Sequence, residues 1–216
     1  MIIIGGNVSG GHFNPAVTLG VFVNEKKPGQ DAVLAIMIWI SQFTGGLVGA
    51  LLAWSVEGFF TSNYNSTDGN IPSAWLPFVY PQDSSGTSPA TTDRSMQTFF
   101  IQAMMTFVFV LTILVVKSKE TEPSDIPAIG AMTVAFALMA CVFVGTRGGP
   151  CYNPAVALGF ILTVQTQTEN PDTYNAYWWC YIFAPFVGGL VAGLVSLMHR
   201  SVVSNGNTKG SPIAMD

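Results

Sequence analysis

The sequence predicts an all-α membrane protein built as an inverted repeat of transmembrane helices, with four full spans and two re-entrant half-helices. Half of its 216 residues are hydrophobic and only 9 % are charged, whereas about a quarter of the residues of a soluble domain carry charge. Four uncharged stretches have roughly the 20-residue length that crosses a bilayer. A short motif containing Asn-Pro-Ala occurs twice, which indicates an internal repeat.

The four expected spans are separated by charged, proline-containing or glycine-containing segments. They cover residues 32–55, 98–116, 126–144 and 177–198. In the first span, Gly45, Gly46 and Gly49 are expected to put small residues on one face, as close helix packing in lipid requires. Gln42 in this span and Gln102 in the second are expected to be structural polar residues.

Each Asn-Pro-Ala motif is expected to begin a short buried helix. Asn is a good helix cap, and Pro at the first helical position lacks an N–H group that would have had no partner there. A single motif would indicate no more than an ordinary capped helix. The uncharged run after each motif is too short for a span, so each helix reaches at most halfway across. The predicted motif residues are Asn14, Pro15, Ala16, Asn153, Pro154 and Ala155.

Three complete spans lie between the two motifs, so the second enters the bilayer from the face opposite the first. The two helix N-termini would then meet near the midplane, where their positive dipole ends repel cations and protons. Irregular backbone at that depth must line a water-filled path or be buried in protein. The predicted path-lining backbone comprises Gly10, Gly11, His12 and Phe13 before the first motif, and Gly149, Pro150, Cys151 and Tyr152 before the second. This arrangement predicts a narrow pore for neutral molecules.

The distribution of charge orients the chain and excludes other classes of protein. If the spans alternate, most basic residues fall on one side, which the positive-inside rule makes cytoplasmic. Segment 57–96 then forms a long extracellular or lumenal loop, whose Asn65 is a candidate for N-glycosylation. The sequence holds no enzyme constellation, metal-ligand cluster or basic run for nucleic acid, so neither catalysis nor a cofactor is expected. The lipid bilayer is the expected partner.

The chain resembles the major intrinsic protein family, the aquaporins and aquaglyceroporins. Residues 11–18, Gly-His-Phe-Asn-Pro-Ala-Val-Thr, are close to that family's first signature, and residues 153–155 lie where its second belongs. Gln42 and residues 185–189, Pro-Phe-Val-Gly-Gly, also resemble family patterns. The resemblance implies a channel for water and small neutral solutes such as glycerol or urea, assembled as a homotetramer with one pore per subunit.

Several positions depart from the family pattern. Val156 stands where the family usually places an Arg that narrows the outer mouth, and the resemblance assigns Cys141 and Pro150 to the same selectivity constriction. The outer mouth of the pore is therefore expected to be wider and more apolar. Arg147 is either a substitute for the absent Arg or a charge on the surface of the loop. The resemblance gives mixed indications of the solute. Ala157 stands where glycerol-conducting relatives tend to carry Asp, which favours water, whereas Ile182 lies near a place where water-type relatives often carry Trp, which does not. The resemblance also implies that Gln102 replaces a Glu, with weaker support for the adjacent loop.

Comparison of the two halves predicts that the first repeat is incomplete. Between Thr98 and the second motif lie 55 residues, whereas 13 precede the first, so about 40 residues are expected to be lacking. The expected channel domain is 1–201, with a first repeat at 1–56 and a second at 97–201, followed by a disordered cytoplasmic tail at 202–216. The alternative is a truncated, non-conducting membrane subunit, in the plasma membrane or an internal membrane.

Overall fold

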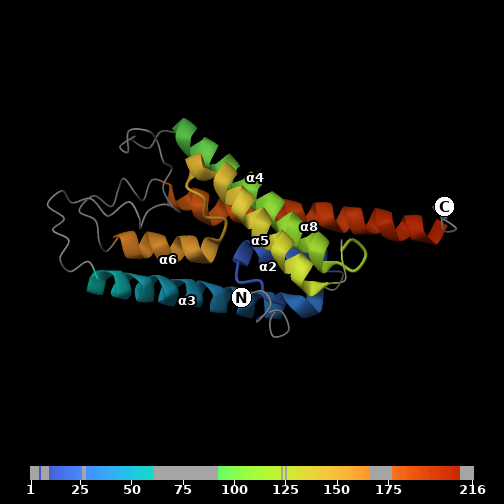
Figure 1. The fold of residues 1–216 in the computed structure, drawn as a ribbon, viewed down its shortest axis with the longest axis horizontal. Coiled ribbons are helices and arrows are strands. Elements are labelled where there is room, and N and C mark those ends of the chain that lie inside the picture. The colour runs from blue at the N-terminus through green and yellow to red at the C-terminus, as the bar shows by residue number, and fades with distance from the viewer. Residues whose placement is uncertain are drawn as a thin grey trace.

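The computed structural model describes residues 5, 10–25, 28–60, 92–122, 124, 126–165 and 177–209. For residues 28–31, 57–60, 92, 164–165 and 205–209 the description covers the backbone alone. Within these ranges the chain is helical and contains no strand. The helices form one elongated bundle, shown in Figure 1. Asn65, the candidate for glycosylation, lies outside the described residues.

Four helices have the length and hydropathy of membrane spans, which confirms the predicted fold class. They are α3 Pro28–Phe60, α4 Thr92–Lys117, α5 Pro127–Val144 and α8 Trp178–Lys209. Their candidate membrane segments are Ala32–Val56, Asp93–Lys117, Pro127–Val144 and Trp178–Ser204. Two shorter apolar helices, α2 Pro15–Asn24 and α6 Pro154–Gln165, begin at the two Asn-Pro-Ala motifs, and the 3-10 helix η2 Thr146–Gly148 precedes the second.

The core of the bundle lies where α4 packs against α8 and α2. Val110 on α4 and Val17 on α2 are fully buried in one apolar cluster with Ala192 of α8. Small residues make this packing possible, because a Cβ added to Gly189 would collide with the carbonyl oxygen of Ala16. The outer faces are apolar instead of polar: Phe100, Phe143 and Met198 are all exposed. Such a surface is suited to contact with lipid.

The α3 helix packs against α6 through only part of its small-residue face. A Cβ added to Gly46 would collide with the carbonyl oxygen of Ala155, and one added to Gly159 of α6 would lie 2.5 Å from the carbonyl oxygen of Gly46. Gly45 and Gly49, by contrast, have open space where a Cβ would stand. The expectation of a single close-packed face therefore holds for Gly46 and not for Gly45 and Gly49, because these two lie four residues apart on a stripe of α3 that α6 does not cover.

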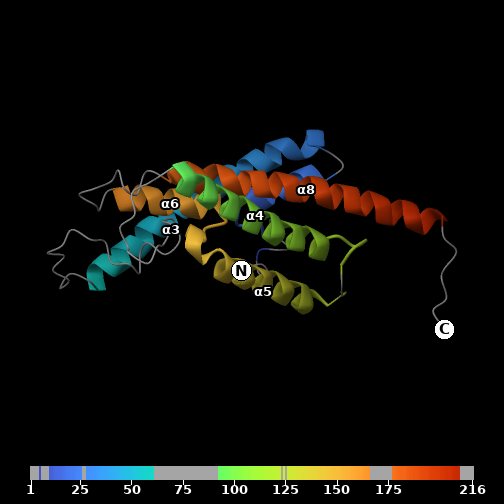
Figure 2. The same ribbon diagram turned by 90° about the horizontal axis from the view of Figure 1, so that it is seen from above.

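The last helix is longer than the sequence suggests. The predicted tail begins at Val202, but α8 continues to Lys209, and residues 210–216 lie outside the described part of the chain. Both views show this end of α8 projecting beyond α4 and α5 (Figures 1 and 2). Once a long helix is formed, each added residue gains a hydrogen bond for the ordering of one residue, without a new nucleation cost. Low hydrophobicity after Ser201 therefore does not end the helix.

Candidate functional site

The two half-helices begin at a common point in the bundle and run away from it in opposite directions. Figure 1 shows α2 and α6 diverging from this point between α3 and α4. Each helix starts with the predicted cap: Asn14 Oδ1 accepts a hydrogen bond from Ala16 N at 2.9 Å, and Asn153 Oδ1 accepts one from Ala155 N at 3.1 Å. Two positive helix ends therefore face each other, as the inverted repeat requires.

The same two asparagines also bind across the gap between the motifs. Asn14 Nδ2 donates to the carbonyl oxygen of Tyr152 at 2.8 Å, and Asn153 Nδ2 donates to the carbonyl oxygen of Phe13 at 2.8 Å. Each amide thus holds the residue that precedes the other asparagine. Because an amide nitrogen carries two hydrogens, one N–H per asparagine is left for a further acceptor. This reciprocal pair was not among the features predicted from the sequence, although the symmetry of the repeat could have indicated it.

A cavity of about 710 Å³, here called the central cavity, opens beside the asparagine pair. Asn14, Asn153 and Tyr152 line it, and Phe109 and Val134 are among the apolar residues of α4 and α5 that form its wall. One side is therefore polar and the other apolar. The predicted path residues Gly10, Gly11, His12 and Phe13 also line this cavity. Gly149, Pro150 and Cys151 are buried and do not line it.

The loop before the first motif is strongly bent and is held from several helices. Gly10, Gly11 and Phe13 have left-handed φ angles of 75°, 64° and 47°. Lys117 Nζ donates to the carbonyl oxygen of Gly10 at 2.7 Å. On the other side of the loop, Thr18 Oγ1 lies 3.3 Å from His12 Nδ1.

The predicted structural residue Gln42 of α3 supports this first half-helix. Its Nε2 donates to Thr18 Oγ1 at 2.9 Å. One turn earlier on α3, Trp39 Nε1 donates to the carbonyl oxygen of Pro15 at 3.0 Å. These bonds join α3 to the beginning of α2, and thereby position Asn14.

Gln102 of α4 holds the loop before the second motif. Its Nε2 donates to the carbonyl oxygens of Gly148 at 2.9 Å and Gly149 at 2.7 Å, and its Oε1 accepts from Cys151 N at 3.3 Å. Tyr181 of α8 adds a hydroxyl bond to the carbonyl oxygen of Gly148 at 3.0 Å. Two of the three Gln102 bonds need an N–H donor, which a carboxylate lacks. Weaker support was expected from Gln102 than from a Glu at this position. In this chain, however, the amide fits the loop better than a carboxylate would, because it can donate both bonds.

The three residues assigned to the selectivity constriction are not gathered around the central cavity. Cys141 Sγ points to the carbonyl oxygen of Met105 at 3.5 Å, within the apolar core. Pro150 is buried, and Val156 is 37 % exposed on the first turn of α6. Arg147, the suggested substitute for the absent Arg, is exposed on η2 and does not line the cavity. Resemblance alone assigned these roles, and the geometry brings no support to them.

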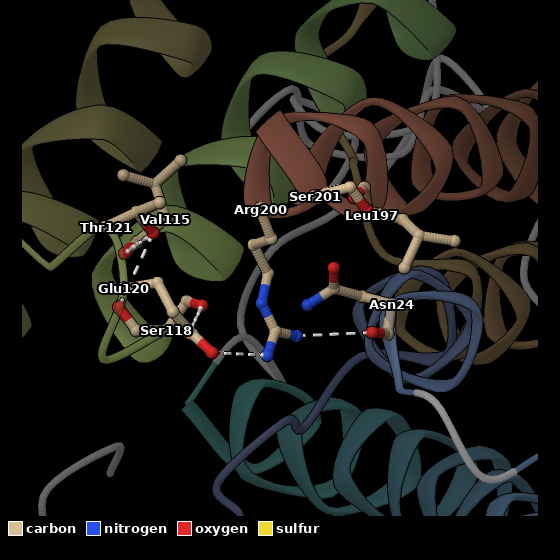
Figure 3. A network of polar contacts seen from close by, with 8 residues as sticks. All are labelled: Asn24, Val115, Ser118, Glu120, Thr121, Leu197, Arg200 and Ser201. Atoms are coloured by element: carbon tan, nitrogen blue, oxygen red, sulfur yellow. Dashed lines mark hydrogen bonds and ion pairs between the residues drawn. The ribbon is translucent and has the colours of Figure 1, made fainter. Parts of the chain in front are cut away.

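A second cavity of about 690 Å³, here called the basic-end cavity, lies where α2, α4 and α8 reach one end of the bundle. Its lining includes Lys117, Lys119 and Arg200, three of the basic residues predicted to share one side of the membrane. Figure 3 shows Arg200 between two partners: Nη2 lies 3.1 Å from Glu120 Oε1, and Nη1 donates to the carbonyl oxygen of Asn24 at 3.3 Å. Arg200 thus joins the end of α2 to the segment after α4.

The Glu120 carboxylate in this cluster has an altered pKa. Ser118 Oγ donates to Glu120 Oε2 at 2.6 Å, and this bond, followed by the bond from Arg200, lowers the pKa of Glu120 to about 2. The carboxylate is therefore charged throughout the physiological pH range, and the link between α8 and the segment after α4 persists there.

The chain matches a known protein family over most of its length. The family model "Major intrinsic protein" matches residues 1–196. The chain is 31 % identical to aquaporin-8 of Mus musculus over 199 residues, covering 88 % of this chain and 62 % of that protein. It is 28 % identical to the glycerol uptake facilitator protein-like 6 of Lactiplantibacillus plantarum, covering 91 % of this chain and 77 % of that protein.

The fold is also found among solved structures. The aquaglyceroporin of Plasmodium falciparum matches with a TM-score of 0.68 and 24 % identity, covering 94 % of this chain and 79 % of that one. This match bears on the fold alone. The chain spans 62 % of the length of the mouse protein, so the activity of the whole relative does not transfer directly.

Proposed function

Because the chain belongs to the major intrinsic protein family, we propose that it is a passive membrane channel for water and small uncharged solutes. The observation that carries this proposal is the reciprocal bonding of Asn14 and Asn153 at the meeting point of two half-helices. The pair presents two N–H donors and two positive helix ends beside a wall of apolar side chains. A neutral molecule with a hydrogen-bond acceptor, such as water, suits this environment, whereas a cation does not.

The class of solute follows from the same geometry and from the relatives. The N–H groups fix the orientation of a solute oxygen, and the apolar wall of α4 and α5 accommodates CH groups without binding them. Such a surface accepts water and also small polyols or urea. The relatives include a protein named as an aquaporin and one named as a glycerol facilitator, at 31 % and 28 % identity. By the family resemblance, and not by this geometry, the uncharged Val156 in place of an Arg favours a mouth wide enough for the larger solutes.

We place the protein in a lipid bilayer as a multi-pass membrane protein, with its lysine-bearing side toward the cytoplasm and a homotetramer as its assembly. The apolar outer faces of four span-length helices support the first statement. The grouping of Lys117, Lys119 and Arg200 around one cavity supports the orientation. The tetramer rests on the family alone.

A non-conducting subunit is the second candidate function. Phe13 is 48 % exposed beside the central asparagines, so a residue expected at membrane depth is incompletely covered within this chain. The lack of Arg at Val156 also favours this alternative.

Osmotic shrinkage of vesicles distinguishes the two candidates. The purified chain is reconstituted into liposomes, mixed rapidly with hyperosmotic sucrose, and followed by light scattering; glycerol and urea are then tested as permeants. If the protein is a channel, liposomes that contain it should shrink or swell faster than protein-free liposomes. Their permeability should also depend less on temperature. Permeability equal to that of the lipid for all three solutes would refute the channel and favour the non-conducting subunit.

A variant of the central pair ties any permeability to the proposed site. Asn153→Asp removes the donor to Phe13 and puts a charge at the membrane midplane, so solute permeability should fall at least roughly tenfold. Gln97→Glu is the matched control, because it makes the same amide-to-acid change on an exposed residue of α4. Equal permeability in Asn153→Asp and wild type would mean that solute passes elsewhere.

A further inference from the structure

The central cavity and the basic-end cavity lie side by side and share part of their lining. Among the described residues, Gly10, His12 and Lys117 are the three that line both of them. This set of three residues is here called the divide. Lys117 lines both cavities, so a solute that moves from the asparagine pair through either of them meets its side chain, and Lys117 is the one member of the divide that is ordinarily charged at neutral pH.

The three groups at the divide are packed around a single point. Lys117 Nζ donates to the carbonyl oxygen of Gly10 at 2.7 Å. A Cβ added to Gly10 would lie 2.9 Å from His12 Nε2 and 3.5 Å from Lys117 Nζ. There is thus no room for even a methyl group without displacement. The left-handed φ of 75° at Gly10 turns its carbonyl oxygen toward the ammonium group and is accessible at low cost only to glycine.

We infer that Lys117 is a specificity-determining residue of the proposed channel, which excludes cations at the divide by its fixed positive charge. This inference rests on the proposed function. Lys117 is exposed to both cavities, and its hydrogen-bonding partner at the divide is a neutral carbonyl oxygen, which leaves the charge in place. Two like charges about 5 Å apart at an effective dielectric constant of about 20 repel enough to lower occupancy roughly 100-fold. Water meets no such barrier.

Acidic residues lie near this charge but outside the divide. Glu25 and Glu120 line the basic-end cavity, and Glu122 lines the central cavity. Glu120 is engaged by Arg200, and Glu25 interacts electrostatically with Lys117 from the end of α2. These carboxylates offset part of the positive potential of Lys117, so the roughly 100-fold reduction in cation occupancy is an upper value. At pH 7.5 the positive charge at the divide is that of Lys117.

Lys117 lies at a different place from the constriction Arg that the family resemblance implies. The family resemblance places the usual constriction Arg directly after the second motif, where this chain has Val156. Lys117 lies on the other side of the asparagine pair, beside the loop that precedes the first motif. Cation exclusion in this chain is therefore assigned to the opposite end of the path.

The test compares cation leak with water permeability in the same liposomes at pH 7.5. Potassium flux is followed with a voltage-sensitive dye under a potassium gradient, and water flux by light scattering. Lys117→Gln keeps an N–H donor for Gly10 but removes the charge, and should raise potassium permeability relative to water by roughly 10-fold to 100-fold. Lys117→Arg should behave as wild type. Lys119→Gln is the matched control, since Lys119 lines the basic-end cavity alone.

Chemical restoration of the charge at position 117 gives a second test, whose outcome does not depend on how well Lys117→Gln folds. The three native cysteines are buried, so a cysteine at position 117 is the accessible thiol for methanethiosulfonate reagents among the described residues. In Lys117→Cys, the aminoethyl reagent restores a positive charge and should suppress the potassium leak, whereas the methyl reagent should not. Equal leak after both reagents, or no leak in Lys117→Gln with water flux intact, would overturn the inference. Lack of water and solute flux in the wild type would instead refute the proposed function, and the inference with it.

Discussion

Replacing Gln102 by Leu should destabilise the protein at the loop before the second motif. Gln102 is 0 % exposed and makes three hydrogen bonds to this loop. Leu fills a similar volume and makes none of them. Gly148 keeps its bond from Tyr181, so two groups, the carbonyl of Gly149 and the N–H of Cys151, lose a protein partner. At about 1–3 kcal/mol for each buried unsatisfied group, the free energy of unfolding should fall by about 2–6 kcal/mol.

The measurement is thermal unfolding in detergent, followed by circular dichroism. For a chain of this length, about 1 kcal/mol corresponds to roughly 2–4 °C, so Tm should fall by at least about 4 °C. Thr106→Val on the same helix is the control. Its hydroxyl is fully buried and has no hydrogen-bond partner, so its removal should leave Tm unchanged or raise it. Equal Tm values for Gln102→Leu and wild type would show that the amide does not hold the loop.

Two further predictions concern helix packing and the basic end of the bundle. Gly46→Ala places a methyl group against the carbonyl oxygen of Ala155 and should lower Tm by several degrees, whereas Gly45→Ala, with open space around it, should not; equal effects would contradict the observed α3–α6 contact. The pKa of Glu120 is lowered to about 2 by the Ser118 hydroxyl and then by Arg200, so its contribution to stability is complete above the ordinary Glu pKa and is lost as pH falls toward 2. The Tm difference between wild type and Glu120→Gln should therefore be constant from pH 8 to about 4.5 and shrink at lower pH, and a decrease already between pH 7 and 6 would argue against the assigned hydrogen bonds.

The spans and half-helices were predictable because they depend on local composition. Uncharged stretches of the required length allow no other structure in lipid, and Asn before Pro specifies where each half-helix begins. The meeting of Asn14 and Asn153 was predictable from topology, because an odd number of spans between two copies inverts one of them. The support given by Gln42 was also accessible, since a polar side chain inside a span must find a partner.

The remaining features depend on tertiary geometry that no local pattern encodes. Two glycines adjacent in sequence, Gly45 and Gly46, differ in packing because successive helix residues point in different directions and α6 covers the side of α3 that bears Gly46. The donor role of Gln102 depends on which backbone groups the loop turns toward it. The contact from Lys117 to Gly10 joins residues 107 apart in sequence, so the lysine resembled an ordinary charge at the end of a span.

The inverted symmetry of the site has a physical consequence for the way it is held together. Each central asparagine caps its own helix and binds the backbone that leads to the other, so the two half-helices stabilise one structure and neither is complete alone. The supports behind them are not symmetric. Neutral groups, Gln102 and Tyr181, hold the loop before the second motif, whereas a charged group, Lys117, holds the loop before the first. A neutral support can fix the backbone without affecting what passes it. A charged support necessarily does both, so holding the loop and excluding cations should be separable in Lys117→Gln.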